Sequence, residues 1–408
     1  MKCRSCGARS LTDFVDLGSA PLSNAYLTEE TLRMPELWVP LKIVVCTGCW
    51  LAQTEDHLTS EQVFTADYAY FSSASASWLK HAESFVDESV MRFGLGHDSL
   101  VIEVAANDGY LLRFVQERGI PCVGIEPTTS TADAARELGL EMVEEFVGLE
   151  TAQAFVGRYG RADLVVANNV LAHVPDVADF VGGLAALMKP AGVLSVEFPR
   201  LTSLIDGGQF DTIYHEHYSY LSLRSVISIF ERCGLSVFDV REIATHGGSL
   251  RVFAQGTEGG TQQTTDSVEQ VLQFERDRGI ETLDYYQGLQ SKAESIKNNF
   301  IRFLIDCRNQ GLSVAAYGAA AKGNTLLNFA GVRPDLLPFV VDKSDSKIGR
   351  YLPGSRIPIV PEEGIRRYRP DFIVILPWNI AEEVTGQLAY AREWDARFVM
   401  AVPRLDVW

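Results

Sequence analysis

A run of reactive side chains lies near the middle of the chain, where Tyr214, His215, Glu216, His217 and Tyr218 follow one another. Phenol, imidazole and carboxylate groups are the types that can remove a proton from a carbon beside a carbonyl group. Two other interpretations stay open: a structural hydrogen-bond network, and a metal site formed by His215, Glu216 and His217. The metal site is less favoured because the spacing differs from that of a His-Glu-x-x-His helix.

Four of the seven cysteines form two Cys-x-x-Cys pairs, Cys3 with Cys6 and Cys46 with Cys49. Four thiolates fill the tetrahedral coordination shell of a structural zinc ion. Redox-active or idle thiols are the alternatives, but two pairs would then have to coincide by chance. The sequence therefore predicts a Zn²⁺ that stabilises the fold and takes no part in chemistry.

A turn with cofactor-binding character follows the apolar strand predicted at 100–104. It holds Glu103, Asn107 and Gly109 and leads into a helix, so that backbone N–H groups can face a cofactor. Glu126 ends the next predicted strand, where a carboxylate can accept both ribose hydroxyls of an adenosine. The turn lacks the full Gly-x-Gly-x-x-Gly set of a pyrophosphate site. We therefore predict S-adenosylmethionine (SAM), which has no phosphate, rather than NAD.

A third segment supports the same cofactor and contains Asn168, Asn169 and His173. It follows the strand predicted at 163–167, where class I methyltransferases place a loop that contacts the methionine part of SAM. Glu103 or Asn107 alone could be simple turn formers. The ordered series of three segments is what predicts the SAM site.

A second strand-to-helix turn lies near the C-terminus, where small residues at 318–321 are followed by Lys322 and Asn324. Helix N-termini and lysine both favour phosphate, although the order of residues is not that of a Walker motif. A vestigial dinucleotide fold, a purely structural domain and a grip on the diphosphate of a nucleotide sugar are the open interpretations. We prefer the third, because His246 and Arg251 can add donors at a domain interface.

The elements that must position these groups divide into three blocks. Residues 1–70 hold both cysteine pairs, which indicates a small zinc-binding domain. Strands alternate with helix-length segments over 71–255, which predicts a mostly parallel sheet and a Rossmann-like class I methyltransferase domain. A polar linker and a helical run over about 267–309 precede a second strand-helix alternation. Residues 256–408 are therefore expected to form a C-terminal Rossmann-like α/β domain with a leading helix.

The composition limits the possible partners. The chain has 408 residues and a formal net charge of -17, which argues against binding to nucleic acid or to an anionic membrane surface. No apolar run is long enough to cross a bilayer, and the N-terminus has no apolar stretch like that of a signal peptide. We expect a cytoplasmic protein that acts on a small molecule.

Taken in order, these motifs resemble the sugar C-methyltransferases of deoxysugar biosynthesis, SAM-dependent enzymes that act on nucleotide-linked 4-keto-6-deoxyhexoses. The resemblance extends over nearly the whole chain and departs from the family at two positions. Ala105 stands where the family often has glycine, and His215 stands where relatives have an acidic residue. The matching segments are the four cysteines, Asn107-Asp108-Gly109, Gly124-Ile125-Glu126-Pro127, Tyr214-His215-Glu216-His217, His246-Gly247-Gly248, Tyr317-Gly318-Ala319-Ala320-Ala321-Lys322 and Trp378-Asn379.

The resemblance implies a mechanism. Methylation of carbon requires a carbanion equivalent, and loss of a proton beside a ketone gives an enolate that can attack the methyl group. His217 would be the base, oriented by Glu216, while Tyr214 and Tyr70 would lie close to the sugar oxygens. A neutral imidazole suits this role, because its unperturbed pKa is about 6.5.

The resemblance also implies the substrate, a 4-keto sugar linked to a nucleotide diphosphate, with dTDP as the expected nucleotide and carbon 3 as the expected acceptor. Trp378 and Asn379 would join the substrate site. Two functions of other classes remain as alternatives: SAM-dependent methylation of oxygen or nitrogen in another small molecule, and a non-catalytic scaffold that carries zinc.

Overall fold

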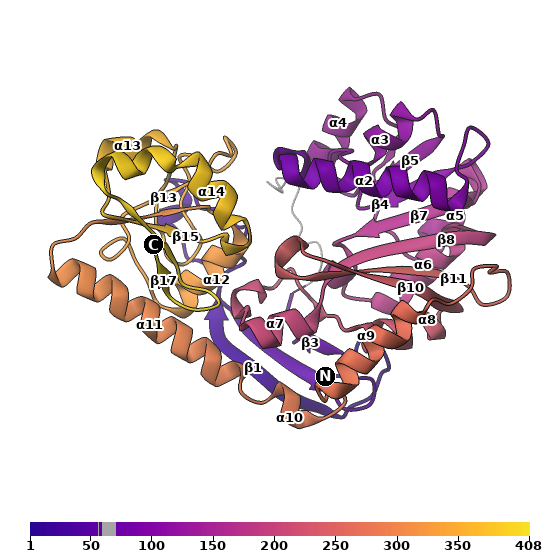
Figure 1. Cartoon of the computed structure of the whole chain (residues 1–408), viewed down its shortest axis with the longest axis horizontal. Helices are drawn as coiled ribbons and strands as arrows, with labels where there is room; N and C mark the ends of the chain where they lie inside the picture. The colour runs from indigo at the N-terminus through magenta and orange to yellow at the C-terminus, as the bar shows by residue number, and fades with distance from the viewer. Residues whose placement is uncertain (56, 59–70) are drawn as a thin grey trace.

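A computed structural model describes residues 1–55, 57–58 and 71–408 and arranges them around three β-sheets. Figure 1 shows the sheet of the C-terminal part at one side and a seven-stranded sheet at the other. The N-terminal strands run below and between them, so this unit joins the other two. Within the described residues, no helix combines the length and the apolar character needed to span a membrane.

The seven-stranded sheet has the order β10-β11-β8-β7-β4-β5-β6. Strands β8, β7, β4, β5 and β6 are parallel, and the β10–β11 hairpin joins them through an antiparallel β11–β8 pair. The order reverses direction at β4, so ligands are expected at the carboxyl ends of β4 and β7. This confirms the predicted class I methyltransferase fold. The strands are β4 (Val101–Val104), β5 (Cys122–Ile125), β6 (Met142–Val143), β7 (Ala162–Asn168), β8 (Met188–Pro199), β10 (Leu235–Ile243) and β11 (Ser249–Gly256).

Helices cover both faces of this sheet, because its parallel strands are apolar on both sides. Val101 and Leu164 pack on one face with α2, α3 and α4, while Ile102 and Val165 pack on the other with α5, α6 and α8. These helices are α2 (Ala76–Phe93), α3 (Leu112–Glu117), α4 (Thr129–Glu137), α5 (Leu149–Tyr159), α6 (Val177–Leu187) and α8 (Leu223–Arg232). Helix α7 (Leu201–Gly207) instead packs into the core of the other two sheets.

The N-terminal sheet has the order β1-β2-β3-β9, and its neighbouring strands are antiparallel. Strands β1 (Leu11–Ala20), β2 (Val39–Cys46) and β3 (Ala52–Thr54) come from the first block of the chain. The fourth strand, β9 (Ser219–Tyr220), follows directly on the reactive run 214–218. The N-terminal unit therefore holds the segment that carries the reactive side chains.

The C-terminal sheet has the order β14-β13-β12-β15-β16-β17 and is parallel except for its last pair. Its face toward the N-terminal unit shares one core with β1 and β2, in which Val15, Ile43 and Val374 are buried together. The elements are β12 (Val314–Tyr317), β13 (Val340–Val341), β14 (Ile359–Val360), β15 (Phe372–Ile375), β16 (Arg397–Met400), β17 (Asp406–Val407), α12 (Ala321–Phe329), α13 (Glu363–Tyr368) and α14 (Ala381–Gln387).

The helical run expected over about 267–309 is divided into three helices, α9 (Asp266–Asp277), α10 (Leu283–Tyr286) and α11 (Leu289–Asn309). Gly279 and Gly288 separate them with φ values of 78° and 99°, which a helix interior does not allow. Helix α9 packs into the core of the seven-stranded sheet, whereas α11 packs into the core shared by the other two sheets. The helix that leads into the C-terminal sheet is therefore α11.

Candidate active site

The four paired cysteines converge on one point. Their sulfur atoms all lie within 4.8 Å of one another, with Cys3 Sγ 3.5 Å from Cys49 Sγ and Cys6 Sγ 3.5 Å from Cys46 Sγ. Tetrahedral ligands with zinc-sulfur bonds of about 2.3 Å have a similar separation. A hydrogen bond from the Cys49 thiol lowers the pKa of Cys3, which favours one thiolate in the cluster. The cluster fits the predicted structural zinc site.

The turn after β4 has the backbone of a ligand-binding loop. Ala105 and Asn107 have φ values of 55° and 51°, in the left-handed region that residues other than glycine seldom adopt. Gly109 has φ 75°, and a Cβ atom there would collide with Leu140. The alanine at 105 thus occupies a conformation that glycine would adopt without strain.

Glu126 follows β5 and faces this turn. Its carboxylate accepts the backbone N–H groups of Asn107 and Thr128, each at 3.0 Å. A carboxylate has about four acceptor sites, so Glu126 can also accept ribose hydroxyls, as its position in the sequence predicts. Burial raises its pKa above the ordinary value.

Glu103 and Asn168 lie at the neighbouring ends of β4 and β7 with unused acceptors. Glu103 is fully buried, and neither carboxylate oxygen has a hydrogen-bond partner among the described residues. Asn168 Nδ2 donates to the Tyr110 hydroxyl at 3.3 Å, while its Oδ1 is unpaired within the same ranges. Burial raises the pKa of Glu103 well above its ordinary value. An ammonium group such as that of SAM would compensate a buried carboxylate of this kind.

The other two predicted cofactor asparagines shape the backbone of the site. Asn107 Oδ1 accepts the N–H of Ser72 at 2.9 Å and so ties the segment before α2 to the cofactor turn. Asn169 has φ 53°, and its N–H donates to the Glu197 carbonyl oxygen at 2.7 Å. Both residues lie at the edge of the sheet where SAM is expected.

His217 is held in one orientation through its two ring nitrogens. Nδ1 lies 2.8 Å from the Thr212 carbonyl oxygen, and Nε2 lies 2.8 Å from the Tyr214 hydroxyl. A carbonyl oxygen only accepts, so Nδ1 carries the proton and the neutral ring has its lone pair on Nε2. The Tyr214 and His217 rings pack together with centroids 3.9 Å apart. His217 therefore presents Nε2 as a proton acceptor.

The prediction that Glu216 orients His217 is wrong. Glu216 Oε1 accepts from Asn24 Nδ2 at 3.1 Å, and Oε2 has no partner among the described residues. The Thr212 carbonyl orients the His217 ring instead. The His217 N–H donates to the Tyr214 carbonyl oxygen and so forms a turn, in which the neighbouring side chains of Glu216 and His217 point in different directions. Burial raises the pKa of Glu216 to about 7.

His215 belongs to the contact with the N-terminal unit. Its Nε2 lies 3.2 Å from the carbonyl oxygens of both Val39 and Pro40. Within the described residues, the cysteine cluster is the one group of His, Cys, Asp and Glu side chains close enough to hold an ion. The metal interpretation of His215, Glu216 and His217 is therefore not supported there.

His173 packs beside His217. The His173 and His217 ring centroids are 4.6 Å apart, and His173 Nδ1 donates to the Glu216 carbonyl oxygen at 2.8 Å. Burial lowers the pKa of His173 to about 4, so the ring is neutral at cellular pH. The structure thus brings this residue, which follows β7, into contact with His217.

Arg251, expected as a substrate contact at a domain interface, is instead an interior residue. It lies on β11, is 4% exposed and forms an ion pair with Glu197 on the adjacent strand β8. His81 of α2 binds the same carboxylate at 2.8 Å, and the guanidinium lies 3.7 Å above the Phe85 ring. The expectation fails because Arg251 is inside a strand pair, although it is close to the linker in sequence.

Three residues of the predicted substrate site gather at the start of α12. Lys322 Nζ donates to Asn379 Oδ1 at 3.0 Å and lies 4.5 Å from the Trp378 ring centroid. Burial lowers the pKa of Lys322 to about 8. The Trp378 indole N–H donates to Asp211 Oδ2 at 2.7 Å. The group therefore lies next to the segment that precedes the reactive run 214–218.

Of the remaining predicted residues, Asn324 lies in the interior of the C-terminal unit. Asn324 is 1% exposed, and neither polar atom of its amide has a partner among the described residues. Tyr70 and the side chain of His246 lie outside the described residues, so their roles stay predictions.

Several residues of the site escaped the sequence analysis. Thr212 acts through its backbone carbonyl, which carries no sequence signal. Asn24 and Thr325 come from distant parts of the chain, and Thr325 Oγ1 donates to the Ile213 carbonyl oxygen at 2.9 Å. Asp211 offered one usable signal, since it precedes the reactive run by three residues.

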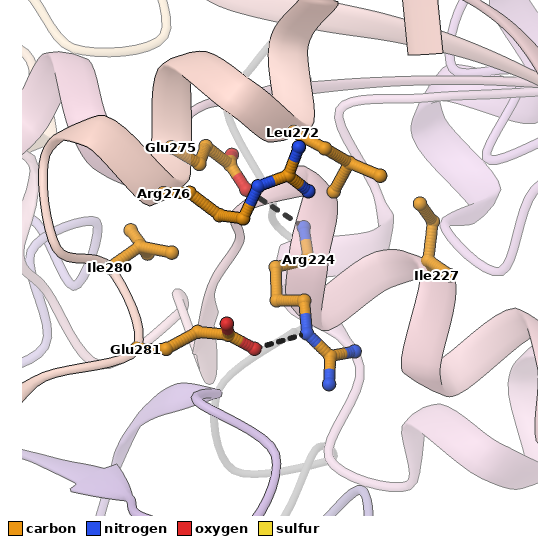
Figure 2. A pocket seen from close by; sticks show the side chains of 7 residues that line it. All are labelled: Arg224, Ile227, Leu272, Glu275, Arg276, Ile280 and Glu281. Atoms are coloured by element: carbon orange, nitrogen blue, oxygen red, sulfur yellow. Dashed lines mark hydrogen bonds and ion pairs between the residues drawn. The ribbon is translucent and has the colours of Figure 1, made fainter. Parts of the chain in front are cut away.

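Figure 2 shows a pocket between α8 and α9 that is lined by other residues and has a structural role. The Glu275 carboxylate accepts the N–H groups of Leu223 and Arg224 at 2.8 Å and 2.9 Å, which caps the first turn of α8. Arg224 Nε also donates to Glu281 at 2.6 Å. These bonds fix α9 to the methyltransferase unit.

Comparison with known families matches the chain in three parts. Residues 3–64 match a zinc binding domain, residues 78–240 a methyltransferase domain and residues 244–403 a C-methyltransferase C-terminal domain. The fold with its cofactor turn and the four-cysteine cluster make SAM and Zn²⁺ the cofactors.

The chain is also similar to individual proteins. It is 35% identical over 402 residues to the C-methyltransferase NovU of Streptomyces niveus, covering 98% of this chain and 95% of that protein. It is 30% identical over 154 residues to a ubiquinone biosynthesis O-methyltransferase of Rhodopseudomonas palustris, covering 32% of this chain and 60% of that protein. The chain therefore belongs to the SAM-dependent C-methyltransferase family with an N-terminal zinc-binding domain.

Proposed function

We propose that this C-methyltransferase methylates carbon 3, beside the ketone, of a dTDP-linked 4-keto-6-deoxy sugar. The observation that carries the proposal is the hydrogen-bond pattern of His217, which presents Nε2 as a base. The sugar is supported by the resemblance of the ordered motifs to sugar C-methyltransferases. An acceptor carbon needs an electron pair, so a base is the first requirement of the reaction.

The chain supplies the steps that create and control the enolate. Nε2 of His217 takes the proton, and the Thr212 carbonyl stabilises the resulting imidazolium through Nδ1–H. Tyr214 turns its hydroxyl from Nε2 to the ketone oxygen as the substrate C–H takes its place. The neutral ring of His173 adds no second positive charge beside the imidazolium. When bound, SAM supplies the electrophilic methyl group.

The nucleotide end of the substrate is proposed to bind at the start of α12. Lys322 provides a cation there, and the backbone N–H groups of a helix N-terminus favour phosphate oxygens. Asn324 contributes a buried amide whose donor and acceptor atoms are unpaired among the described residues. His246 and Tyr70 complete the proposed set of substrate contacts.

Incubation with SAM labelled in its methyl group and a dTDP-4-keto-6-deoxyhexose tests the proposal. Mass spectrometry and NMR of the product should place the label on the carbon beside the ketone. A label on oxygen or nitrogen would instead support the alternative methyltransferase function. Absence of transfer from zinc-replete protein that binds SAM would support the non-catalytic scaffold.

A further inference from the structure

We infer that Thr325 and Trp378 of the C-terminal unit are positioning residues for the base, because they hold the turn whose Thr212 carbonyl fixes the His217 ring. The inference rests on the proposed role of His217. It assigns part of the catalytic geometry to a unit that otherwise would serve only to bind substrate.

Hydrogen bonds from the C-terminal unit hold the turn on both sides of Thr212. Thr325 Oγ1 donates to the Ile213 carbonyl oxygen at 2.9 Å, and Trp378 Nε1 donates to Asp211 Oδ2 at 2.7 Å. Asp211 and Ile213 are the residues that flank Thr212 in the chain. Displacement of either flank would therefore turn the Thr212 carbonyl away from the imidazole.

Burial makes these two bonds effective. Thr325 is 2% exposed and Asp211 is 1% exposed, so water does not compete for either hydrogen bond. Phe210 packs edge to face on Phe329 of α12 with centroids 5.4 Å apart. The turn and α12 therefore form one packed unit that spans two sheets of the molecule.

The indole of Trp378 is itself fixed in place. A Cβ atom at Gly247 would collide with its ring, and Gln209 Nε2 donates to the Gly247 carbonyl oxygen at 2.9 Å. Lys322 covers the ring with its ammonium group at 4.5 Å from the centroid. These contacts hold the ring where its N–H donates to Asp211 Oδ2.

Loss of the Thr212 acceptor has two consequences for the base. A neutral imidazole without that partner populates both tautomers, and only the one with its lone pair on Nε2 can accept the proton. The imidazolium also loses its stabilising carbonyl, so the acidic limb of the pH-rate profile should move to lower pH. Among the described residues, the titratable rings that face His217 are those of His173, Tyr214 and Tyr220, and the proposed substitutions change none of them.

Thr325→Val and Trp378→Phe test the inference, with Thr202→Val and Trp394→Phe as matched controls. The Thr202 hydroxyl is buried without a partner among the described residues, and the Trp394 indole donates to the Pro370 carbonyl oxygen at 3.1 Å. The two test variants should lose about tenfold or more in kcat, a part of the roughly 10²–10⁴-fold that a general base contributes. The KM of Thr325→Val and the affinity of both test variants for S-adenosylhomocysteine should stay within about twofold of wild type. The controls should keep the wild-type kcat.

A spectroscopic measurement reads the ring directly. In protein with ¹⁵N-labelled histidine, the His217 signals are identified by their loss in His217→Asn. Wild type should show a protonated Nδ1 and an unprotonated Nε2, and Thr325→Val should move the two signals toward each other. Asp211→Asn keeps an acceptor for the indole and should retain at least about a third of the wild-type kcat, since the hydrogen bond survives.

The outcomes separate this inference from the proposed function. If His217→Asn is inactive while Thr325→Val and Trp378→Phe match their controls in kcat and in the ring signals, the positioning role is overturned and the base assignment stands. If His217→Asn is active, the base assignment fails, and the ring signals still decide whether these residues fix His217. Should Trp378→Phe fail to fold, Thr325→Val and its control decide the matter.

Discussion

The cofactor end of the site has hydrogen-bond acceptors without partners in the described part of the chain, whereas the ring nitrogens of His217 are both hydrogen-bonded. Glu103 has two buried carboxylate oxygens without partners among the described residues, and Asn168 has one such carbonyl oxygen. The ammonium and ribose hydroxyls of SAM are donors, so a pocket rich in spare acceptors is complementary to them. At the base, by contrast, both ring nitrogens of His217 are engaged. The cofactor end is therefore ready to accept hydrogen bonds, and the base is held in a single tautomer.

Glu126→Gln should weaken cofactor binding, because the ribose hydroxyls lose a charged acceptor. We expect a loss of about 1–3 kcal/mol in the binding free energy of S-adenosylhomocysteine, measured by calorimetry. Glu145→Gln, a change at an exposed carboxylate, is the matched control and should bind as wild type does. Equal affinity of the Glu126 variant and the control would show that the ribose lies elsewhere.

Glu216 should make stability depend on pH. Its pKa is about 7 in the folded chain and about 4.3 in an unfolded one, so the native state holds the extra proton between these values. Its contribution to stability is present below about pH 4.3 and is lost as the pH rises through 7. Glu216→Gln should flatten the fall in Tm between pH 5 and pH 8, whereas the exposed control Glu258→Gln should not. Parallel Tm curves for wild type and Glu216→Gln would contradict this account.

Among the secondary-structure elements, the short strand β9 links zinc to the chemistry. It pairs with β3 through Ala52 and Gln53, and β3 follows the second cysteine pair in the chain. The segment from His217 to Tyr220 is thereby fastened to the zinc-binding sheet, with Thr54 N–H donating to the Tyr218 carbonyl oxygen at 3.1 Å. Loss of zinc should therefore disturb the position of His217, even though no catalytic role is assigned to the metal.

Metal analysis should find about one zinc per chain, and Cys49→Ser should lower this value. Since the cofactor turn lies on a different sheet, zinc-depleted protein that remains folded should still bind S-adenosylhomocysteine while its kcat falls. Calorimetry and turnover on the same preparation make the comparison, and zinc addition to chelated wild type should restore activity. Full activity of folded, zinc-free protein would contradict the link through β9.

At the scale of the whole molecule, all three units meet at the turn 209–217. Asn24 reaches Glu216 from the N-terminal unit, while Thr325 and Trp378 reach the turn from the C-terminal unit. The cofactor residues come from the seven-stranded sheet. An isolated methyltransferase unit would therefore keep its cofactor turn but lose the supports of its base.

The same geometry explains what the sequence could and could not predict. The strands, the cofactor turn and the cysteine cluster follow from local patterns of apolar residues, turns and ligand spacing. Thr212 could not be found because a backbone carbonyl leaves no trace in the sequence. The predicted roles of Glu216 and Arg251 were wrong, because proximity in sequence does not determine where a side chain points. Glu216 lies in a turn, and Arg251 lies inside a strand pair. Asn24 and Thr325 reach the site only through tertiary packing.

The central claim is that His217 removes the proton beside the ketone, and hydrogen exchange tests it without methyl transfer. Wild-type protein with S-adenosylhomocysteine and a dTDP-4-keto-6-deoxyhexose in D₂O should exchange the α-hydrogen of the sugar, as followed by NMR. His217→Asn should bind both ligands and exchange no more than about a hundredth as fast, as the loss of a general base predicts. His97→Asn, a change at an exposed histidine, should exchange like wild type. Retention of more than about a tenth of the wild-type exchange rate by His217→Asn would assign the proton transfer to another group.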